Sequence, residues 1–98
     1  MSSQASNTVG DVLKERAQTH GNFRVQAHNS QLLKEYVFAK LDRRLDIEAP
    51  PETNDVIKEA VEMICVKLSR AMCGNPYEPD HYLDIAGYAQ LIVNELKK

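Results

Sequence analysis

The 98-residue chain lacks several features that would place it in a familiar functional class. Its net charge is -2 and its pI is near 5.9, whereas proteins that bind duplex nucleic acid usually carry a basic stripe. No apolar run approaches the roughly 20 residues of a membrane span, and the first residues lack the basic and apolar parts of a signal peptide. We therefore expect a cytoplasmic protein that binds neither duplex nucleic acid nor membranes.

Glycine and cysteine are also scarce. The four glycines are scattered along the chain, which excludes a glycine-rich phosphate loop. Cys65 and Cys73 would be separated by a rise of about 12 Å on one helix, which is too far for a disulfide. Two cysteines without a paired Cys/His set do not make a zinc site either. We expect two buried or half-buried thiols.

The chain instead has helical periodicity, without strand-like alternation, repeats or low-complexity segments beyond its first residues. Residues 1–7 are small and polar, and we expect them to be flexible. Residues 8–98 are predicted to form a single all-α domain, a four-helix bundle. The predicted helices cover about 9–19, with a cap at Thr8 or Asn7 and a stop at Gly21, then about 22–45, then from a cap at Thr53 or Asn54 to Cys73, and finally from Asp80 to the basic C-terminus.

One helical pattern predicts burial, and another leaves burial or exposure open. Ile57, Val61, Ile64 and Leu68 recur on one stripe of the third helix, with Ala71 at its edge, and this is the expected core face. Residues 26–31 form a polar patch in the second helix that either faces solvent or lines a polar pocket. The usual exposure of these residue types favours solvent.

Carboxylates supply one candidate site. Glu59 and Glu62 lie three residues apart on the third helix, and Asp80 and Asp84 flank His81 on the fourth. In a helix bundle these acids are within reach of a shared oxygen-rich site for Mg²⁺, which proteins hold with carboxylates and substrate phosphates. The alternative is that Glu59 and Glu62 are ordinary solvent-exposed acids.

Cations supply a second candidate site. Lys67 falls among apolar residues of the third helix, with Arg70 close by. Either the stem of Lys67 covers apolar surface while its amine reaches water or forms a structural ion pair with Asp84, or Lys67 and Arg70 hold a phosphate or carboxylate. Tyr88, one turn after Asp84, either pairs with it or contacts a sugar or base.

Arg16 and His20 lie on adjacent turns of the first helix, where they could reach a phosphate. An exposed arginine is the simpler interpretation.

Four segments together resemble a known group. They are Glu15-Arg-Ala-Gln-Thr-His-Gly-Asn-Phe23, Glu62-Met-Ile-Cys-Val-Lys-Leu-Ser-Arg70, Gly74-Asn-Pro and Asp80-His-Tyr-Leu-Asp-Ile-Ala-Gly-Tyr-Ala89. They resemble small phage and prophage proteins of undefined function, distantly similar to the all-α nucleoside triphosphate pyrophosphohydrolases, the MazG-like superfamily. The resemblance covers most of the chain from about residue 9 onward.

The resemblance implies a dimeric helical bundle that binds a nucleotide and cleaves a nucleoside triphosphate with Mg²⁺. It implies metal ligands at Glu59, Glu62 and Asp84, with Asp80 as a substitute ligand, and a catalytic role for Asp84 and Glu62. It also implies phosphate contacts from Lys67 and Arg70. His81 stands where the superfamily's motif has an acid, so the pattern favours nucleotide binding over hydrolysis.

The helices also favour a homodimer on their own account. Met63 and Val66 give the third helix a second apolar surface, and Leu91 lies on the polar side of the fourth. A small bundle would leave part of this surface exposed. The alternative function is a non-enzymatic helical dimer that sequesters a nucleotide or binds a host protein.

Overall fold

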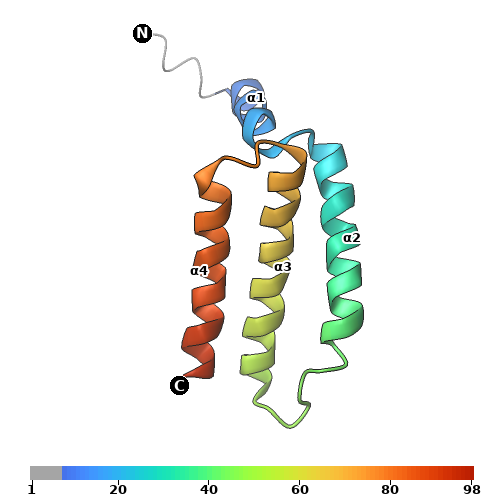
Figure 1. The fold of residues 1–98 in the computed structure, drawn as a ribbon, viewed down its shortest axis with the longest axis vertical. Helices are drawn as coiled ribbons and strands as arrows, with labels where there is room; N and C mark the ends of the chain where they lie inside the picture. The colour runs from blue at the N-terminus through green and yellow to red at the C-terminus, as the bar shows by residue number, and fades with distance from the viewer. Residues whose placement is uncertain (1–7) are drawn as a thin grey trace.

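Residues 8–98, described by a computed structural model, form four α-helices and no strands (Figure 1). The helices are α1 (Val9–His20), α2 (Phe23–Leu41), α3 (Pro51–Cys73) and α4 (Pro79–Leu96). The predicted all-α, four-helix class is confirmed. The flexibility expected of residues 1–7 lies outside the described residues.

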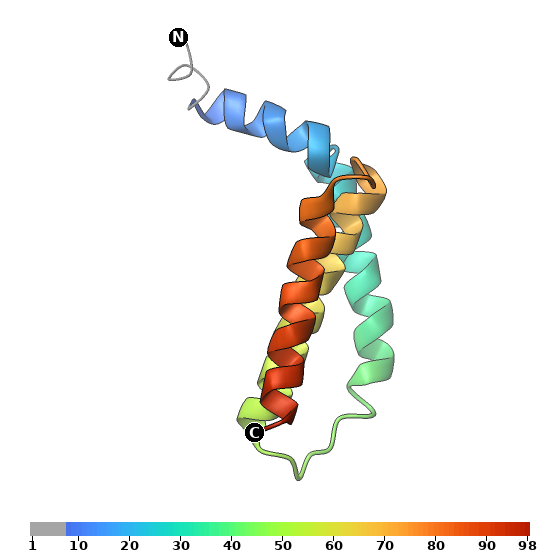
Figure 2. The same ribbon diagram turned by 60° about the vertical axis from the view of Figure 1, so that its left-hand side comes forward.

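Helices α2, α3 and α4 lie side by side in one layer, with α3 in the middle (Figure 1). Within residues 8–98, α2 and α4 do not pack against each other, so α3 is the only link between them in this layer. Helix α1 crosses the end of the layer where α2 begins and projects to one side (Figure 2). No helix among these residues has both the length and the apolar character needed to span a membrane.

The first helix begins and ends, and the second begins, where their capping residues predict. The Thr8 hydroxyl accepts a hydrogen bond from the Asp11 amide at 3.1 Å, and the Asn22 side chain accepts one from the Arg24 amide at 2.9 Å. Between them Gly21 has a φ of 81°, a conformation that favours glycine. The two helices therefore meet at a sharp corner.

The predicted end of the second helix is wrong, because α2 ends at Leu41 and not near Leu45. Asp46 redirects the chain: its carboxylate accepts a hydrogen bond from the Glu48 amide at 2.8 Å. Its backbone carbonyl accepts another from the Asn54 side chain at 2.9 Å. Such local side-chain bonds favour a turn over a helix.

The predicted cap of the third helix at Thr53 or Asn54 is also wrong. Helix α3 begins at Pro51, whose fixed φ suits the first helical position. The Thr53 hydroxyl instead donates to the Glu95 carboxylate of α4 at 3.0 Å, and Asn54 holds the preceding loop.

Helix α4 begins one residue before Asp80, at Pro79. Its cap is Glu78, whose carboxylate accepts a hydrogen bond from the Asp80 amide at 3.3 Å. Asp80 lies in the first turn, where its charge complements the helix dipole.

The expected core face of the third helix is only partly covered. Leu68 is 40% exposed, and Ile57, Val61 and Ile64 are half-buried, so that only Ala71 of this set is buried. The reason is the layer arrangement, in which α2 and α4 cover two opposite sides of α3 and leave this stripe between them open.

The seam between α2 and α3 is polar. Gln26 and Ser30 are 5% and 3% exposed, so the solvent-facing interpretation is wrong for these two residues. The Ser69 hydroxyl donates to the Gln26 carbonyl at 2.6 Å across the seam. Small residues on α3, Ser69 and Cys65, allow this close approach. As expected, Cys65 is buried and Cys73 half-buried.

Candidate functional site

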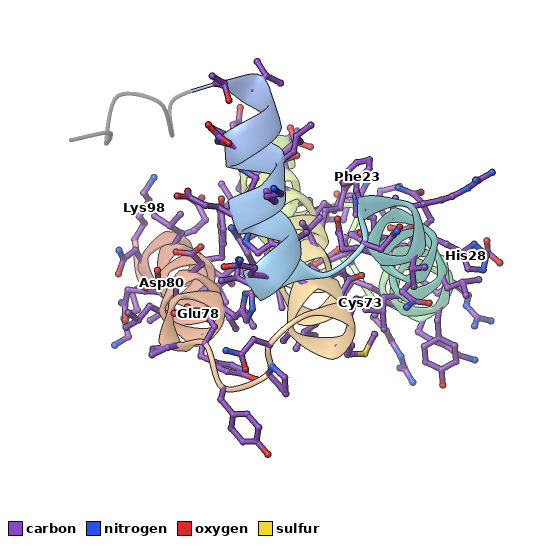
Figure 3. All side chains as sticks on the ribbon, turned by 90° about the horizontal axis from the view of Figure 1, so that it is seen from above. Phe23, His28, Cys73, Glu78, Asp80 and Lys98 are labelled. Atoms are coloured by element: carbon purple, nitrogen blue, oxygen red, sulfur yellow. The ribbon has the colours of Figure 1, made fainter. Side chains whose placement is uncertain are left out.

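A pocket of about 450 Å³ lies where α1, α2 and the end of α3 meet. Seen from above, Phe23 at the start of α2 points toward the side on which α1 lies (Figure 3). The residues that line this pocket are Leu13, Arg16, Ala17, His20, Gly21, Asn22, Phe23, Gln26 and Arg70. We call it the corner pocket.

Three basic side chains line the corner pocket: Arg16 and His20 from α1 and Arg70 from α3. The Arg70 Nε atom is buried, and within the described residues no hydrogen-bond acceptor lies in reach of it. A buried donor without a partner costs about 1 to 3 kcal/mol, more when it is charged. The wall of this pocket thus holds a guanidinium whose Nε lacks an acceptor.

Several basic side chains lie near His20. Its pKa is lowered, first by burial and then by the charges of Arg70, His81, Lys67 and Arg16. Since a neighbouring cation disfavours a second positive charge, the part of this shift that comes from Arg70, Lys67 and Arg16 indicates a positive potential at the pocket, beside the larger effect of burial. An anion would be attracted to the same place.

His81 is 2% exposed and joins α4 to α1. Its Nε2 lies 3.0 Å from the Thr19 carbonyl, and because a carbonyl only accepts, Nε2 is the protonated nitrogen. Its ring centroid is 5.6 Å from that of His20. His81 therefore positions α1, a role that the helical pattern did not indicate.

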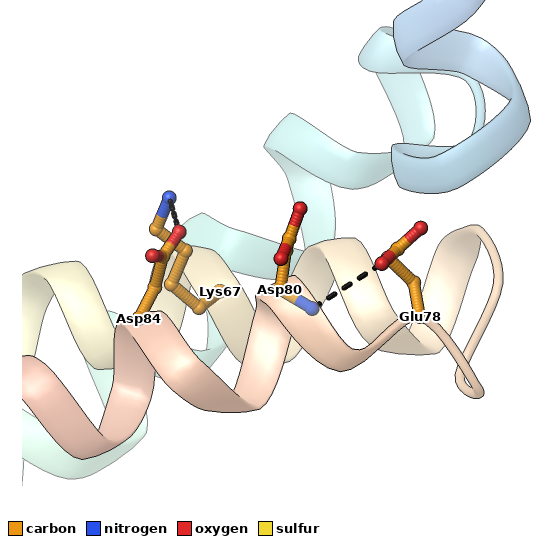
Figure 4. Close-up of polar contacts among 4 residues, drawn as sticks. All are labelled: Lys67, Glu78, Asp80 and Asp84. Carbon is orange, nitrogen blue, oxygen red and sulfur yellow. Dashed lines mark hydrogen bonds and ion pairs between the residues drawn. The ribbon is translucent and has the colours of Figure 1, made fainter.

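Lys67 and Asp84 form an ion pair, with the Lys67 Nζ 2.8 Å from an Asp84 carboxylate oxygen (Figure 4). The Lys67 side chain is 14% exposed and that of Asp84 is 49% exposed. The hydrogen bond from Lys67, followed by its charge, lowers the pKa of Asp84. Of the two interpretations of Lys67, the structure shows the ion pair.

The four candidate metal ligands are spread over two helices. Asp80 and Asp84 project from the same side of α4, one turn apart (Figure 4). Glu59 lies beside an apolar hollow, while Glu62 lies near enough to Cys65 for its charge to raise the pKa of that thiol, which burial raises most. Within residues 8–98 no three His, Cys, Asp or Glu side chains are grouped to hold a metal ion.

Tyr88 is half-buried and lies away from the corner pocket. It lines one hollow with Glu59 and Leu91, and another with Asp84 and Leu91. The structure thus brings together Arg16, His20 and Arg70, but leaves Tyr88 outside this group.

Sequence reasoning missed Phe23 and Gln26, which line the same pocket. Phe23 comes directly after the cap of α2 and is 77% exposed, and this position at a helix start was the one available signal. The burial of Gln26 depends on the packing of α3, which no local pattern reveals.

The arrangement can bind an anion, because two arginines and a histidine line one open pocket and the Nε of Arg70 lacks an acceptor. It contains no nucleophile paired with a base. Neither family models, nor curated proteins, nor solved structures give a match to this chain.

Proposed function

We propose that the protein binds a nucleotide, with the phosphate groups held in the corner pocket. The observation that carries this proposal is the buried Arg70 Nε without an acceptor. A phosphate in the pocket would give this guanidinium an acceptor, and a guanidinium can donate to two oxygens at once.

The charges around the pocket suit a group with more than one negative charge. Arg16 and His20 belong to α1, and Arg70 reaches the pocket from α3, so the cations come from two elements. Helix α2 also begins at the pocket, since Asn22 and Phe23 both line it. The amide end of a helix carries a partial positive charge that favours phosphate.

Phe23 favours a nucleotide over inorganic phosphate. Its ring is 77% exposed at the rim of the pocket. An exposed ring beside a phosphate site offers a flat surface on which a base can stack, and stacking contributes about 1 to 3 kcal/mol per base. The ligand would then contact two different groups, Arg70 through phosphate and Phe23 through the base.

The proposal concerns binding and does not extend to hydrolysis. A pyrophosphohydrolase of the kind that the sequence resembles would need Mg²⁺ held by the acids at positions 59, 62, 80 and 84. In the described residues these acids are not grouped, and Asp84 pairs with Lys67. A protein that binds or sequesters a nucleotide is in better accord with this geometry.

The test is titration calorimetry with nucleoside mono-, di- and triphosphates and with inorganic phosphate. Arg70→Met keeps the aliphatic stem and removes the guanidinium, and we expect it to weaken binding roughly 10- to 100-fold, since a charged hydrogen bond contributes about 1.5 to 3 kcal/mol. Phe23→Ala should weaken nucleotide binding and leave phosphate binding unchanged.

The matched control is Arg24→Met. It removes an exposed arginine at the start of α2 that does not line the pocket. We expect it to bind as the original chain does. Equal affinities in Arg70→Met and Arg24→Met, or no binding of any of these anions, would overturn the proposal. A parallel assay for pyrophosphate release with Mg²⁺ separates binding from turnover.

A further inference from the structure

The large apolar residues of this chain are mostly not buried. Within residues 8–98 the buried hydrophobic residues are Ala60, Cys65 and Ala71, which are all small. Six larger ones gather on one side of α3 and α4 and are exposed or half-buried: Val61, Leu68, Met72, Tyr82, Val93 and Leu96. We call this surface the open face.

Helix geometry and one hollow establish that these six share a side. At 100° per residue, Leu68 lies on α3 opposite Glu59, and Leu96 lies on α4 nearly opposite Leu91. Glu59 and Leu91 line the same hollow, so they mark one face of the layer. The residues opposite them must lie together on the other face.

The open face lies away from the corner pocket. Arg70 falls on the same side of α3 as Glu59 by the same helix geometry, and α1 contributes to the pocket above it. The described residues contain no element that covers the other face, because α2 and α4 flank α3 and α1 packs at the end of the layer.

The size of the open face suits a stable interface. Helix α4 has 18 residues and so is about 27 Å long, and two neighbouring helices span about 20 Å. The flat area is on the order of 550 Å² per protomer, and a pair of copies would bury on the order of 1,100 Å² in total. A specific protein interface needs about 1,000 Å².

The charge pattern indicates which partner fits. The stripes of the open face carry no charged side chain between Ile57 and Met72 on α3, or between Tyr82 and Leu96 on α4. A neutral apolar surface can meet its own copy about a two-fold axis without repulsion between like charges. Because α3 and α4 run antiparallel, such an axis can place each on its counterpart from the other protomer.

We propose that a second copy of this chain covers the open face, so that α3 and α4 of both protomers form a four-helix core. The corner pocket of each protomer then lies on the outer side of the dimer and remains accessible. This proposal does not depend on nucleotide binding.

The experiment is size-exclusion chromatography with light scattering at micromolar and near-millimolar concentrations. We expect a mass of twice 11.1 kDa for the original chain. Val93→Lys places an ammonium within the interface, where its desolvation opposes association, and this variant should have the monomer mass. Leu96→Lys, at a residue that is 61% exposed, tests the same surface with less risk to the fold.

Leu83→Lys is the matched control, since Leu83 is 66% exposed on the same helix but points away from the open face. It should remain a dimer. Circular dichroism checks that each variant keeps its helices. A monomer at all concentrations, or a dimer that persists in both Val93→Lys and Leu96→Lys, would overturn the proposal; the first outcome would leave the face to a different protein partner.

Discussion

The two faces of the helical layer differ in kind. One face carries Lys67, Asp84 and Arg70, and α1 adds Arg16 and His20 above its end. The other is the open face, which has apolar side chains and no charge along its stripes. Both belong to α3 and α4, so the difference comes from which side each residue occupies and from the position of α1.

This difference separates the two tasks proposed for the molecule. A charged pocket with an unpaired guanidinium is suited to an anion, whereas an uncharged apolar surface is suited to another protein surface. The fold of the single chain relies on small and polar groups at the α2–α3 seam and at the corner, because the large apolar residues are mostly not buried. Changes at the corner should therefore affect stability most.

The largest expected effect is at the corner that holds α1 on its side of the layer. A Cβ on Gly74 would lie 2.0 Å from the Thr19 carbonyl oxygen, and one on Gly21 would lie 2.1 Å from that of Cys73. Both contacts are with backbone, which cannot rotate away. We expect Gly74→Ala to lower the free energy of unfolding by about 3 kcal/mol or more.

Chemical denaturation of Gly74→Ala and Gly87→Ala measures this effect against a matched control. A Cβ on Gly87 meets nothing within 4 Å, and alanine is the better helix former, so Gly87→Ala should raise stability by about 1 kcal/mol. If both variants were equally stable, the corner would not be the contact that fixes α1.

Local sequence signals predicted much of the fold, but they did not predict which residues are buried where helix packing determines burial. Thr8, Asn22 and Gly21 are signals that act on their own helix ends, and the structure confirms them. Helical periodicity also identified the stripe that contains Leu68, but periodicity cannot say whether a neighbouring helix covers it. Leu68 is 40% exposed because α3 has neighbours on two opposite sides only.

The candidate site was predicted only in part, because some of its contacts depend on how the helices pack. The pairing of Lys67 with Asp84 was one of two interpretations, since a long cationic side chain among apolar residues needs a nearby partner. Gln26 lines the pocket through the contact of α2 with Ser69, which is 43 residues away in the sequence. Contacts of that range depend on the arrangement of all four helices.

A second prediction concerns the ion pair between Lys67 and Asp84 on the charged face. Asp84→Ala would leave the Lys67 ammonium, which is 14% exposed, without its partner. Lys67→Met would leave a carboxylate that is 49% exposed and remains hydrated. An unpaired charge destabilises the fold more when it is more buried. Asp84→Ala should therefore lower the melting temperature by on the order of 5 °C, and Lys67→Met by less.

Differential scanning calorimetry of both variants and of the double variant checks this. The double variant should melt above Asp84→Ala, since it removes the unpaired ammonium as well. Equal melting temperatures for the two single variants would mean that the Lys67 side chain reaches water without Asp84.

The smallest expected effect is the pH dependence of stability that comes from His20 in the corner pocket. Burial and the surrounding cations Arg70, His81, Lys67 and Arg16 lower the pKa of His20 below its ordinary value of 6.5. As the pH falls, His20 is therefore protonated in the unfolded chain before it is protonated in the native state. The free energy of unfolding decreases as the pH falls from about 6.5 to the lowered pKa of His20. His20→Gln should remove this loss, whereas His28→Gln, at an exposed histidine, should not.

Sulfate distinguishes a pocket effect from a general effect of acid, because its own charge is constant over this range. An anion bound beside His20 favours the protonated imidazole, so added sulfate should reduce the acid-dependent loss in the original chain and have no such effect in His20→Gln. The measurement is the melting temperature across the pH range with sulfate and with chloride at equal ionic strength. If sulfate acted equally on both chains, His20 would lie outside the anion site, and Arg70 and Arg16 alone would define the charged end of the pocket.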